Sequence, residues 1–123
     1  MIILNDERFN NEKFCYVSNL NDIKKSKNNS TLIFQYNEND LNLYKFCQNN
    51  SIPYGVEIET ITQFIFLLNL GAKYAICNNL DFAITLQKIA DNYLSETKIV
   101  IKSKIEEIEK IALKEIDAIF IIK

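Results

Sequence analysis

Short apolar segments rich in β-branched and aromatic residues alternate with segments of helical periodicity from residue 14 to the end of the chain. The apolar segments recur roughly every twenty residues, the length of one strand, one helix and two short turns. Near-continuous apolar strands separated by helices are typical of a parallel sheet with both faces covered. Strands are therefore predicted over 14–18, 31–36, 54–58, 74–77, 98–102 and 118–122.

Helices are predicted between these strands, because apolar residues there are spaced at i, i+3, i+4 and i+7. The segment 81–94 shows this spacing most clearly, with Leu86 and Ile89 on one face and Lys88 opposite. The other predicted helices cover 20–27, 40–48, 60–70 and 104–115. The opening residues 1–13 are expected to form an arm or an extra strand.

The whole chain, residues 1–123, is predicted to form one domain, since 123 residues suffice for one domain of common size and no linker divides them. The predicted architecture is α/β, a three-layer α/β/α sandwich. Its sheet is expected to be Rossmann-like, mostly parallel and six-stranded.

The composition excludes several classes of function. The chain has 14 basic and 16 acidic residues, so no basic excess indicates a nucleic-acid partner. It has no His, which removes His-based acid–base catalysis, nucleophile activation and metal ligation. Its three cysteines form no CxxC pair and are interpreted as reduced thiols. The most apolar run, 61–70, is about half as long as a bilayer-spanning helix. We therefore expect a cytoplasmic protein with no membrane insertion.

Ligands of open parallel sheets bind beyond the carboxyl ends of the strands, and the residues at those positions are the candidate ligand-binding residues. These candidates are amides and carboxylates: Asn19, Asn37, Glu59, Asn78 and Asp81. A phosphate cradle needs several glycines, and the chain has only Gly55 and Gly71, so no nucleotide cofactor is predicted.

Three features at the strand ends could carry a chemical function, and each also has a simpler structural interpretation. Glu59 with Asp81 could hold a divalent cation, but solvated carboxylates are commoner, and no metal site is predicted. Cys77 is interpreted as an inert, partly buried thiol, because no His or nearby cation would activate it. Lys102 could form a Schiff base only if desolvated, and a surface lysine is commoner. No catalytic residue is predicted.

The predicted helix 60–70 is apolar around most of its circumference. Such a helix is either enclosed within the monomer or covered by a partner, and a domain of this size encloses few helices. A homodimer is therefore expected, with Phe64, Phe66 and Leu67 as interface candidates.

Several motifs carry a resemblance to the TrkA-N or RCK family, the Rossmann-type regulatory domains of potassium transporters and channels. The matching stretches lie in the second half of the chain: Pro53-Tyr54-Gly55-Val56-Glu57, Gly71-Ala72-Lys73-Tyr74-Ala75-Ile76, Asn78-Asn79-Leu80-Asp81 and Ile116-Asp117-Ala118-Ile119. The resemblance implies a dimeric regulatory domain, a membrane transporter subunit as partner and, with the crossover rule, the strand order 3-2-1-4-5-6. The family's Gly-x-Gly-x-x-Gly is missing after the first strand, which implies that nucleotide sensing is lost or altered.

Residues 54–77 also resemble two successive units of a small aldolase-type (β/α)8 barrel, without its phosphate-binding glycines or a convincing Schiff-base lysine. Two hypotheses for function follow. The first is a non-catalytic regulatory or protein-interaction module. The alternative is a small-molecule binding protein, or a small enzyme, that uses the polar strand-end rim.

Overall fold

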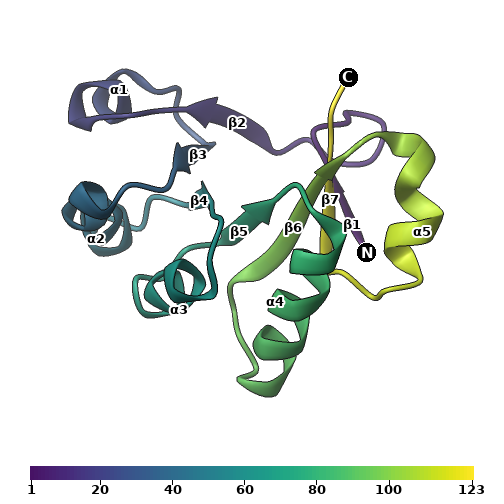
Figure 1. Cartoon of the computed structure of the whole chain (residues 1–123). Coiled ribbons are helices and arrows are strands. Elements are labelled where there is room, and N and C mark those ends of the chain that lie inside the picture. Colours follow the sequence, from purple (N-terminus) through teal and green to yellow (C-terminus); the bar gives the residue numbers. More distant parts are fainter.

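The computed structural model describes residues 1–123 and contains seven strands and five α-helices (Figure 1). The strands are β1 (Ile2–Leu4), β2 (Lys13–Tyr16), β3 (Ser30–Gln35), β4 (Tyr54–Glu57), β5 (Tyr74–Cys77), β6 (Lys98–Ser103) and β7 (Ala118–Ile121). The helices are α1 (Leu20–Lys25), α2 (Leu41–Asn49), α3 (Ile61–Asn69), α4 (Leu80–Asn92) and α5 (Ile108–Ala112), with two 3-10 helices, η1 (Glu38–Asp40) and η2 (Ile105–Glu107). None of the helices combines the length and apolarity that crossing a bilayer requires.

All seven strands are parallel and lie in the order β1-β7-β6-β5-β4-β3-β2, so from β2 to β7 each strand pairs with the next one in the chain. Crossovers of one hand between sequential neighbours place every helix on the same face of the sheet. Figure 1 shows the five helices around the outside of the sheet, which curls into a half-barrel.

The prediction of a Rossmann-like α/β fold with a parallel sheet is confirmed, with three corrections. The sheet has seven strands rather than six, because β1 forms within residues 1–13, as the extra-strand alternative predicted, and pairs with β7. The predicted order 3-2-1-4-5-6 is wrong, because the strands follow one another sequentially. The prediction of helices on both faces is also wrong. The helices cover one face, and the other face is covered by side chains from the strands across the curled sheet.

Two separate cores show how both faces are buried. The outer core joins the convex face of the sheet to the helices; within it Tyr44 and Tyr54 stack, and Phe34 meets both rings edge to face. The inner core contains strand residues only: Leu4, Ile33, Tyr74, Ile76, Val100, Ala118 and Phe120, with Phe14 packed against them. The rings of Phe14 on β2 and Phe120 on β7 lie 5.1 Å apart, although four strands separate β2 from β7 in the sheet. The sheet is therefore curled tightly enough for its own inner side chains to fill the concave face.

Gly55 on β4 allows the side chain of Tyr74 on β5 to pack close to the β4 backbone in this inner core. A Cβ at Gly55 would lie 2.9 Å from the Cβ of Tyr74 on the adjacent strand. Contacts shorter than 3.0 Å essentially never occur between real Cβ atoms and their neighbours. The glycine is therefore explained by packing at the curl rather than by a backbone conformation that only glycine adopts.

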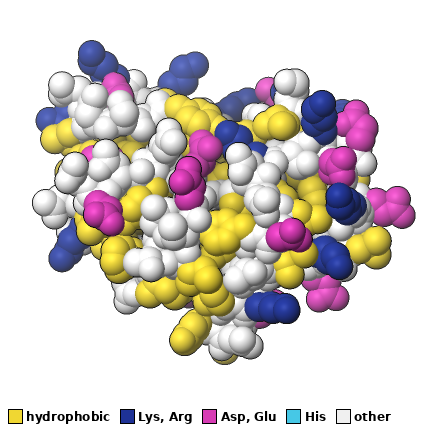
Figure 2. Space-filling view, in the orientation of Figure 1, with side chains coloured by type: hydrophobic (Ala, Val, Ile, Leu, Met, Phe, Trp, Pro, Cys, Tyr) yellow, Lys and Arg dark blue, Asp and Glu magenta, His cyan; other side chains and the backbone are white.

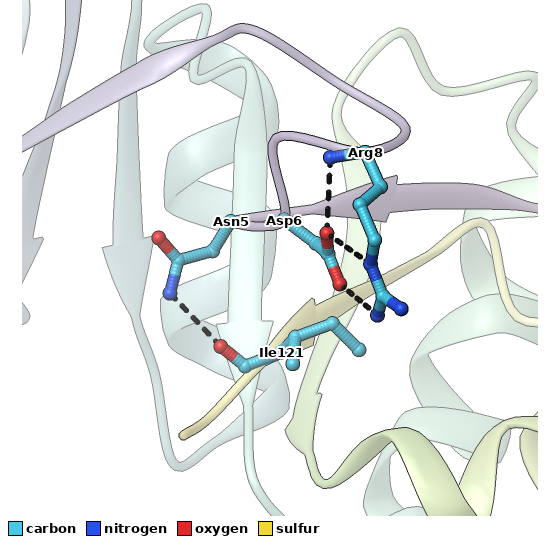
Figure 3. Close-up of polar contacts among 4 residues, drawn as sticks. All are labelled: Asn5, Asp6, Arg8 and Ile121. Atoms are coloured by element: carbon cyan, nitrogen blue, oxygen red, sulfur yellow. Dashed lines mark hydrogen bonds and ion pairs between the residues drawn. The ribbon is translucent and has the colours of Figure 1, made fainter.

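The link between β1 and β2 contains no helix, and polar contacts hold it (Figure 3). The Asn5 side chain donates a hydrogen bond to the Ile121 carbonyl at 2.9 Å, which ties the end of β1 to β7. The Arg8 guanidinium donates to both carboxylate oxygens of Asp6, at 3.0 and 2.7 Å. This paired contact lowers the pKa of Asp6 to about 2.

Glu12 closes the amino-terminal end of the concave face. Its carboxylate accepts hydrogen bonds from Thr31 Oγ1 on β3, from Tyr74 Oη on β5 at 2.6 Å and from Lys73 Nζ at 2.9 Å. One side chain thus connects the segment before β2 both to β3, the neighbour of β2, and to β5, which lies beyond β3 and β4 in the sheet. Burial opposes ionisation of Glu12 and is the largest single influence, but the three hydrogen bonds together outweigh it and lower the pKa.

The α3 helix is half-buried, which corrects the predicted interface. Phe64 and Leu67 have 0% exposure and pack in the outer core. Phe66 is the one interface candidate that is accessible, with 39% exposure. Phe64 and Leu67 are therefore core residues, and Leu68 packs partly buried against the same core.

Candidate functional site

The carboxyl ends of the inner strands bring polar side chains to one mouth of the half-barrel. Tyr16, Gln35, Glu57 and Lys102 lie on β2, β3, β4 and β6. Each follows by two positions a residue of the concave face, and residues two apart on a strand point to the same side. The strands of the inner core thus end in polar groups that all face the same mouth.

Lys102 lies at the centre of this group. Its ammonium donates to Tyr16 Oη at 3.3 Å and to Glu57 Oε1 at 3.4 Å. It also lies over the ring of Tyr16, 5.6 Å from the centroid, and over that of Phe120 at 5.9 Å. The contact with Tyr16 spans the concave side from β6 to β2.

These contacts decide the charge on Lys102. Partial burial alone would lower its pKa, but the Tyr16 hydroxyl and the Glu57 carboxylate raise it above its ordinary value. A Schiff base requires the neutral amine, so the surroundings of Lys102 favour an electrostatic role over a nucleophilic one.

Two pockets open beside this group, and Gln35, Tyr36 and Glu57 line both of them. The larger has a volume of about 560 Å³, within the usual range for small-molecule sites. The smaller, of about 220 Å³, continues toward the carboxyl end of β5. Residues of the larger pocket are Tyr16, Val17, Ser18, Asp22, Ile33, Gln35, Tyr36, Asn37, Asp40 and Glu57.

Three carboxylates line the larger pocket, and no Lys or Arg does. Asp22 accepts hydrogen bonds from the amide and the hydroxyl of Ser18, both at 3.0 Å, and these bonds lower its pKa. Glu57 is paired with Lys102. Asp40 immediately precedes α2, but its side chain makes no capping hydrogen bond and no ion pair. It is therefore the carboxylate of this pocket with no partner in the protein.

The Tyr36 hydroxyl is buried and has no hydrogen-bond partner. Burial, with a smaller effect from the charge of Glu38, raises the pKa of Tyr36, so the phenol stays neutral. An unpaired buried hydroxyl costs about 1–3 kcal/mol. The ring of Tyr36 packs against the outer core, with its centroid 6.1 Å from that of Tyr44, and its hydroxyl is not exposed to either pocket.

The structure distributes the five predicted ligand-binding residues among different roles. Asn37 lines the larger pocket, while Glu59 and Asn78 line the smaller one. Asn19 and Asp81 line neither of these pockets. Asn19 and Asn37 both act as N-caps, accepting from the amides of residues 22 and 39.

The predicted ligand-binding residues do not include Tyr16, Gln35, Glu57, Asp40 or Lys102, although Lys102 is among the strand-end residues considered for chemistry. Each strand residue among them stands at or near a strand end, so the alternation of inward and outward positions could have selected them. Asp40 had no such signal, because it reaches the pocket through the turn between β3 and α2.

Cys77 borders the smaller pocket but is not a reactive thiol. Burial raises its pKa to about 11, and the hydrogen bond to the Asn79 carbonyl is weak at 3.9 Å. The thiol therefore stays protonated at neutral pH, which agrees with the interpretation of an inert cysteine. No group of three or more acidic or cysteine side chains lies close enough together to hold a metal ion.

The largest pocket, of about 880 Å³, lies at the opposite edge of the sheet, between the ends of α3 and α4. Its walls are mixed, with apolar side chains such as Ile65, Leu68 and Leu94 and polar residues of the turns that precede β5 and β6. The only charged residues there are Lys73, which is already paired with Glu12, and Glu96. We therefore place the candidate site at the carboxyl-end mouth, where polar groups converge.

Comparison with known proteins assigns no family to this chain. No family model and no curated protein matches the sequence. The sequential strand order also differs from the order that the resemblance to TrkA-N/RCK domains implied. That resemblance stays a prediction, and function is argued from the site.

Proposed function

We propose that this chain is a small-molecule binding protein, whose ligand occupies the carboxyl-end mouth of the half-barrel. The single observation that carries the proposal is the pair of adjoining pockets, of about 560 and 220 Å³, that share Gln35, Tyr36 and Glu57 at the carboxyl ends of β3 and β4. The pockets lie where parallel sheets bind their ligands, beyond the carboxyl ends of the strands.

The chemistry of the mouth supports binding rather than covalent catalysis. Lys102 is held as an ammonium by Glu57 and Tyr16. The thiol of Cys77 is protonated, because burial raises its pKa to about 11. Neither side chain is present in the ionisation state that a nucleophile requires.

Filling the mouth tests this proposal. Gln35 is exposed, lines both pockets and makes no side-chain hydrogen bond, so Gln35→Trp blocks the site without removing a contact. Lys98→Trp is the matched control, because Lys98 is an exposed strand residue at the opposite end of the half-barrel. A panel of nucleotides, sugars, amino acids, amines and dicarboxylates is screened by thermal shift, and amide NMR shifts locate each hit.

We expect at least one compound to stabilise the wild type and Lys98→Trp and to shift amides of residues 35–40. A ligand at a hundred times its Kd stabilises by about 2.7 kcal/mol, which is readily seen as a rise in Tm. Gln35→Trp should weaken binding more than tenfold. Equal affinity of the two variants, or no compound that shifts these amides, contradicts the proposal.

The second candidate function is a regulatory or interaction module that pairs with itself, as the resemblance to TrkA-N/RCK domains implies. One observation favours it: Tyr93 and Leu94, just past α4, are 72% and 87% exposed, and they line one pocket together with Ile65 and Leu68 of α3. Figure 2 shows hydrophobic surface in this lower part of the molecule, over α3 and α4.

The change Tyr93→Ser with Leu94→Ser tests self-association. If this surface joins two copies, wild-type protein at tens of micromolar sediments as a dimer and the double variant as a monomer, because apolar burial drives association. Analytical ultracentrifugation measures both species. A wild-type monomer at this concentration, or a double variant that remains dimeric, rules out self-association through this surface.

A further inference from the structure

The strand β2 forms one edge of the sheet, and no strand pairs with its outer side (Figure 1). Its inner side pairs with β3, and Val17, directly after β2, donates to the Ile33 carbonyl at 3.0 Å. Backbone groups of successive strand residues point to opposite sides in the plane of the sheet. The amides and carbonyls of Phe14 and Tyr16 therefore point away from β3, toward the open edge.

The protein satisfies both ends of this open row of backbone groups and leaves its middle free. The amide of Glu12 donates to the Asn10 side chain at 2.8 Å, and the amide of Ser18 donates to a carboxylate oxygen of Asp22 at 3.0 Å. Outside the pairing of β2 with β3, no hydrogen bond involves the amides or carbonyls of the two edge-facing residues between them. Two residues of each chain thus keep a free donor and a free acceptor.

The sequence of β2 does not protect this edge against another strand. Natural edge strands are usually protected by charged side chains, proline, a bulge or a covering segment. Residues 14–17 contain neither charge nor proline. Lys13, the one charged residue of β2, is paired with Glu7 of its own chain. Tyr16 is 58% exposed, so the free part of the edge is accessible.

A second copy of the chain offers the complementary groups in one register. Two β2 strands related by a two-fold axis run antiparallel, and residues that exchange hydrogen bonds lie directly opposite each other. With Cys15 opposite Cys15 of the second copy, Phe14 lies opposite Tyr16 on both sides, and every free amide meets a free carbonyl. Sliding one strand by two residues puts Tyr16 opposite Glu12, or Phe14 opposite Ser18, whose amides are already bonded.

The side chains suit the same register. Phe14 and Tyr16 share the concave side of β2, so each ring meets the other kind of ring in the second copy, and such cross-strand aromatic pairs stabilise antiparallel strands. On the convex side, the partly exposed Cys15 meets its own counterpart. This pair exchanges no hydrogen bonds and is therefore of the closer kind, with Cα atoms about 4.5 Å apart.

We propose that two copies of this chain associate through β2, in an antiparallel pair that joins two half-barrels into one continuous sheet. An antiparallel pair at the edge of an otherwise parallel sheet is common. The interface differs from the surface at Tyr93 and Leu94, and it requires no ligand at the carboxyl-end mouth.

Tyr16→Pro tests the hydrogen bonds of this interface. Proline removes the amide that points away from β3, and edge strands accept proline at such positions. Tyr16→Ala is the matched control, because it removes the same side chain, including its contact with Lys102, but keeps the amide. Analytical ultracentrifugation under reducing conditions measures the dimer Kd, and amide NMR spectra check that each variant is folded.

We expect the wild type to be a dimer at tens of micromolar. Tyr16→Ala should raise the dimer Kd about thirtyfold or less, for the loss of two cross-strand aromatic pairs. Tyr16→Pro should raise it at least about tenfold further, because the dimer also loses the hydrogen bonds of two amides.

Cross-linking through Cys15 tests the register in the unchanged chain. A Cα separation of about 4.5 Å lies within the range of disulfides, so copper phenanthroline as oxidant should link the two Cys15 thiols. Peptide mass mapping identifies the linkage, and Cys47 and Cys77 are buried. Cys15→Ser with Lys13→Cys is the matched control. In this register the two copies of position 13 are four residues apart along the strands, about 14 Å, which is too far for a disulfide.

Each contrary outcome overturns a stated part of the proposal. A wild type that is monomeric at tens of micromolar excludes the second copy and makes a strand of another protein the alternative occupant. Equal dimer Kd values for Tyr16→Pro and Tyr16→Ala show that the edge amides do not join the copies. Equal cross-linking through positions 13 and 15 overturns the register. A dimer that persists in Tyr16→Pro but separates in Tyr93→Ser with Leu94→Ser is joined through the other surface.

Discussion

Phe64→Ala should lower the free energy of unfolding by about 4 kcal/mol, whereas Phe66→Ala on the same helix should lower it by less than about 1 kcal/mol. Phe64 has 0% exposure and packs in the outer core, and burying an aromatic ring contributes both transfer free energy and contacts that a cavity would lose. Phe66 is 39% exposed and leaves no closed cavity. Urea unfolding of both variants measures the difference.

A loss of about 4 kcal/mol is a large share of the free energy of unfolding of a small domain. A less destabilising substitution at the same position is therefore measured as well. Phe64→Leu keeps most of the volume and should cost about 1.5 kcal/mol or less. A graded series of wild type, Phe64→Leu and Phe64→Ala identifies a core residue. Equal effects of Phe64→Ala and Phe66→Ala would show instead that both rings lie in similar surroundings.

The alternation of apolar strands and periodic helices was sufficient to predict the α/β class and most element positions. The strand predicted over 74–77 coincides with β5, and the helix predicted over 81–94 corresponds to α4, Leu80–Asn92. Both predictions depend only on the spacing of apolar residues within the segment itself. The segment 104–115 is less regular than expected, with η2 followed by the short α5.

Strand order could not be predicted, because two arrangements bury the same strands. A continuous apolar run such as 98–101 needs cover on both faces, and a second layer of helices is one way to supply it. In this fold Val100 faces the inner core, where strands from across the half-barrel cover it, and Ile99 faces the helices. The pattern along a strand is identical in the two arrangements, so only contacts between distant segments decide between them.

The predicted ligand site and the candidate site of the structure lie at the same edge of the sheet, and they share Asn37, Glu59 and Asn78 as residues that line the two pockets. Asn19 and Asn37 were selected as polar residues after strands, yet such positions are also helix starts, where amides act as caps. Gln35 and Lys102 stand at strand ends, but the role of Gln35 depends on the two pockets that it borders, and that of Lys102 on a contact across the mouth. These are properties of the folded chain.

The contacts of Glu12, at the other end of the half-barrel, likewise exist only in the folded chain. Glu12→Ala should lower the free energy of unfolding by about 3 kcal/mol. The change leaves the hydroxyls of Thr31 and Tyr74 without their acceptor, and each unpaired buried donor costs about 1–3 kcal/mol. Lys73 adds less, because its side chain is partly exposed. Glu12→Gln retains an acceptor oxygen and should cost about half as much. Glu7→Gln is the control, since the Glu7–Lys13 pair is exposed and contributes less than about 1 kcal/mol.

The pH dependence of unfolding separates the charge of Glu12 from its packing. The folded state holds the pKa of Glu12 below its ordinary value of 4.5, so the unfolded chain takes up this proton first as pH falls. The stability that Glu12 contributes is therefore fully present above pH 4.5 and is lost as pH falls through the folded pKa. Urea midpoints of wild type and Glu12→Gln should converge on acidification, because Gln does not titrate, whereas those of wild type and Glu7→Gln should stay close throughout. If the difference between the urea midpoints of wild type and Glu12→Gln stays undiminished below the ordinary pKa, the Gln side chain destabilises the fold through its packing and hydrogen-bonding geometry. The charge on Glu12 would then contribute nothing to the stability of this end of the half-barrel.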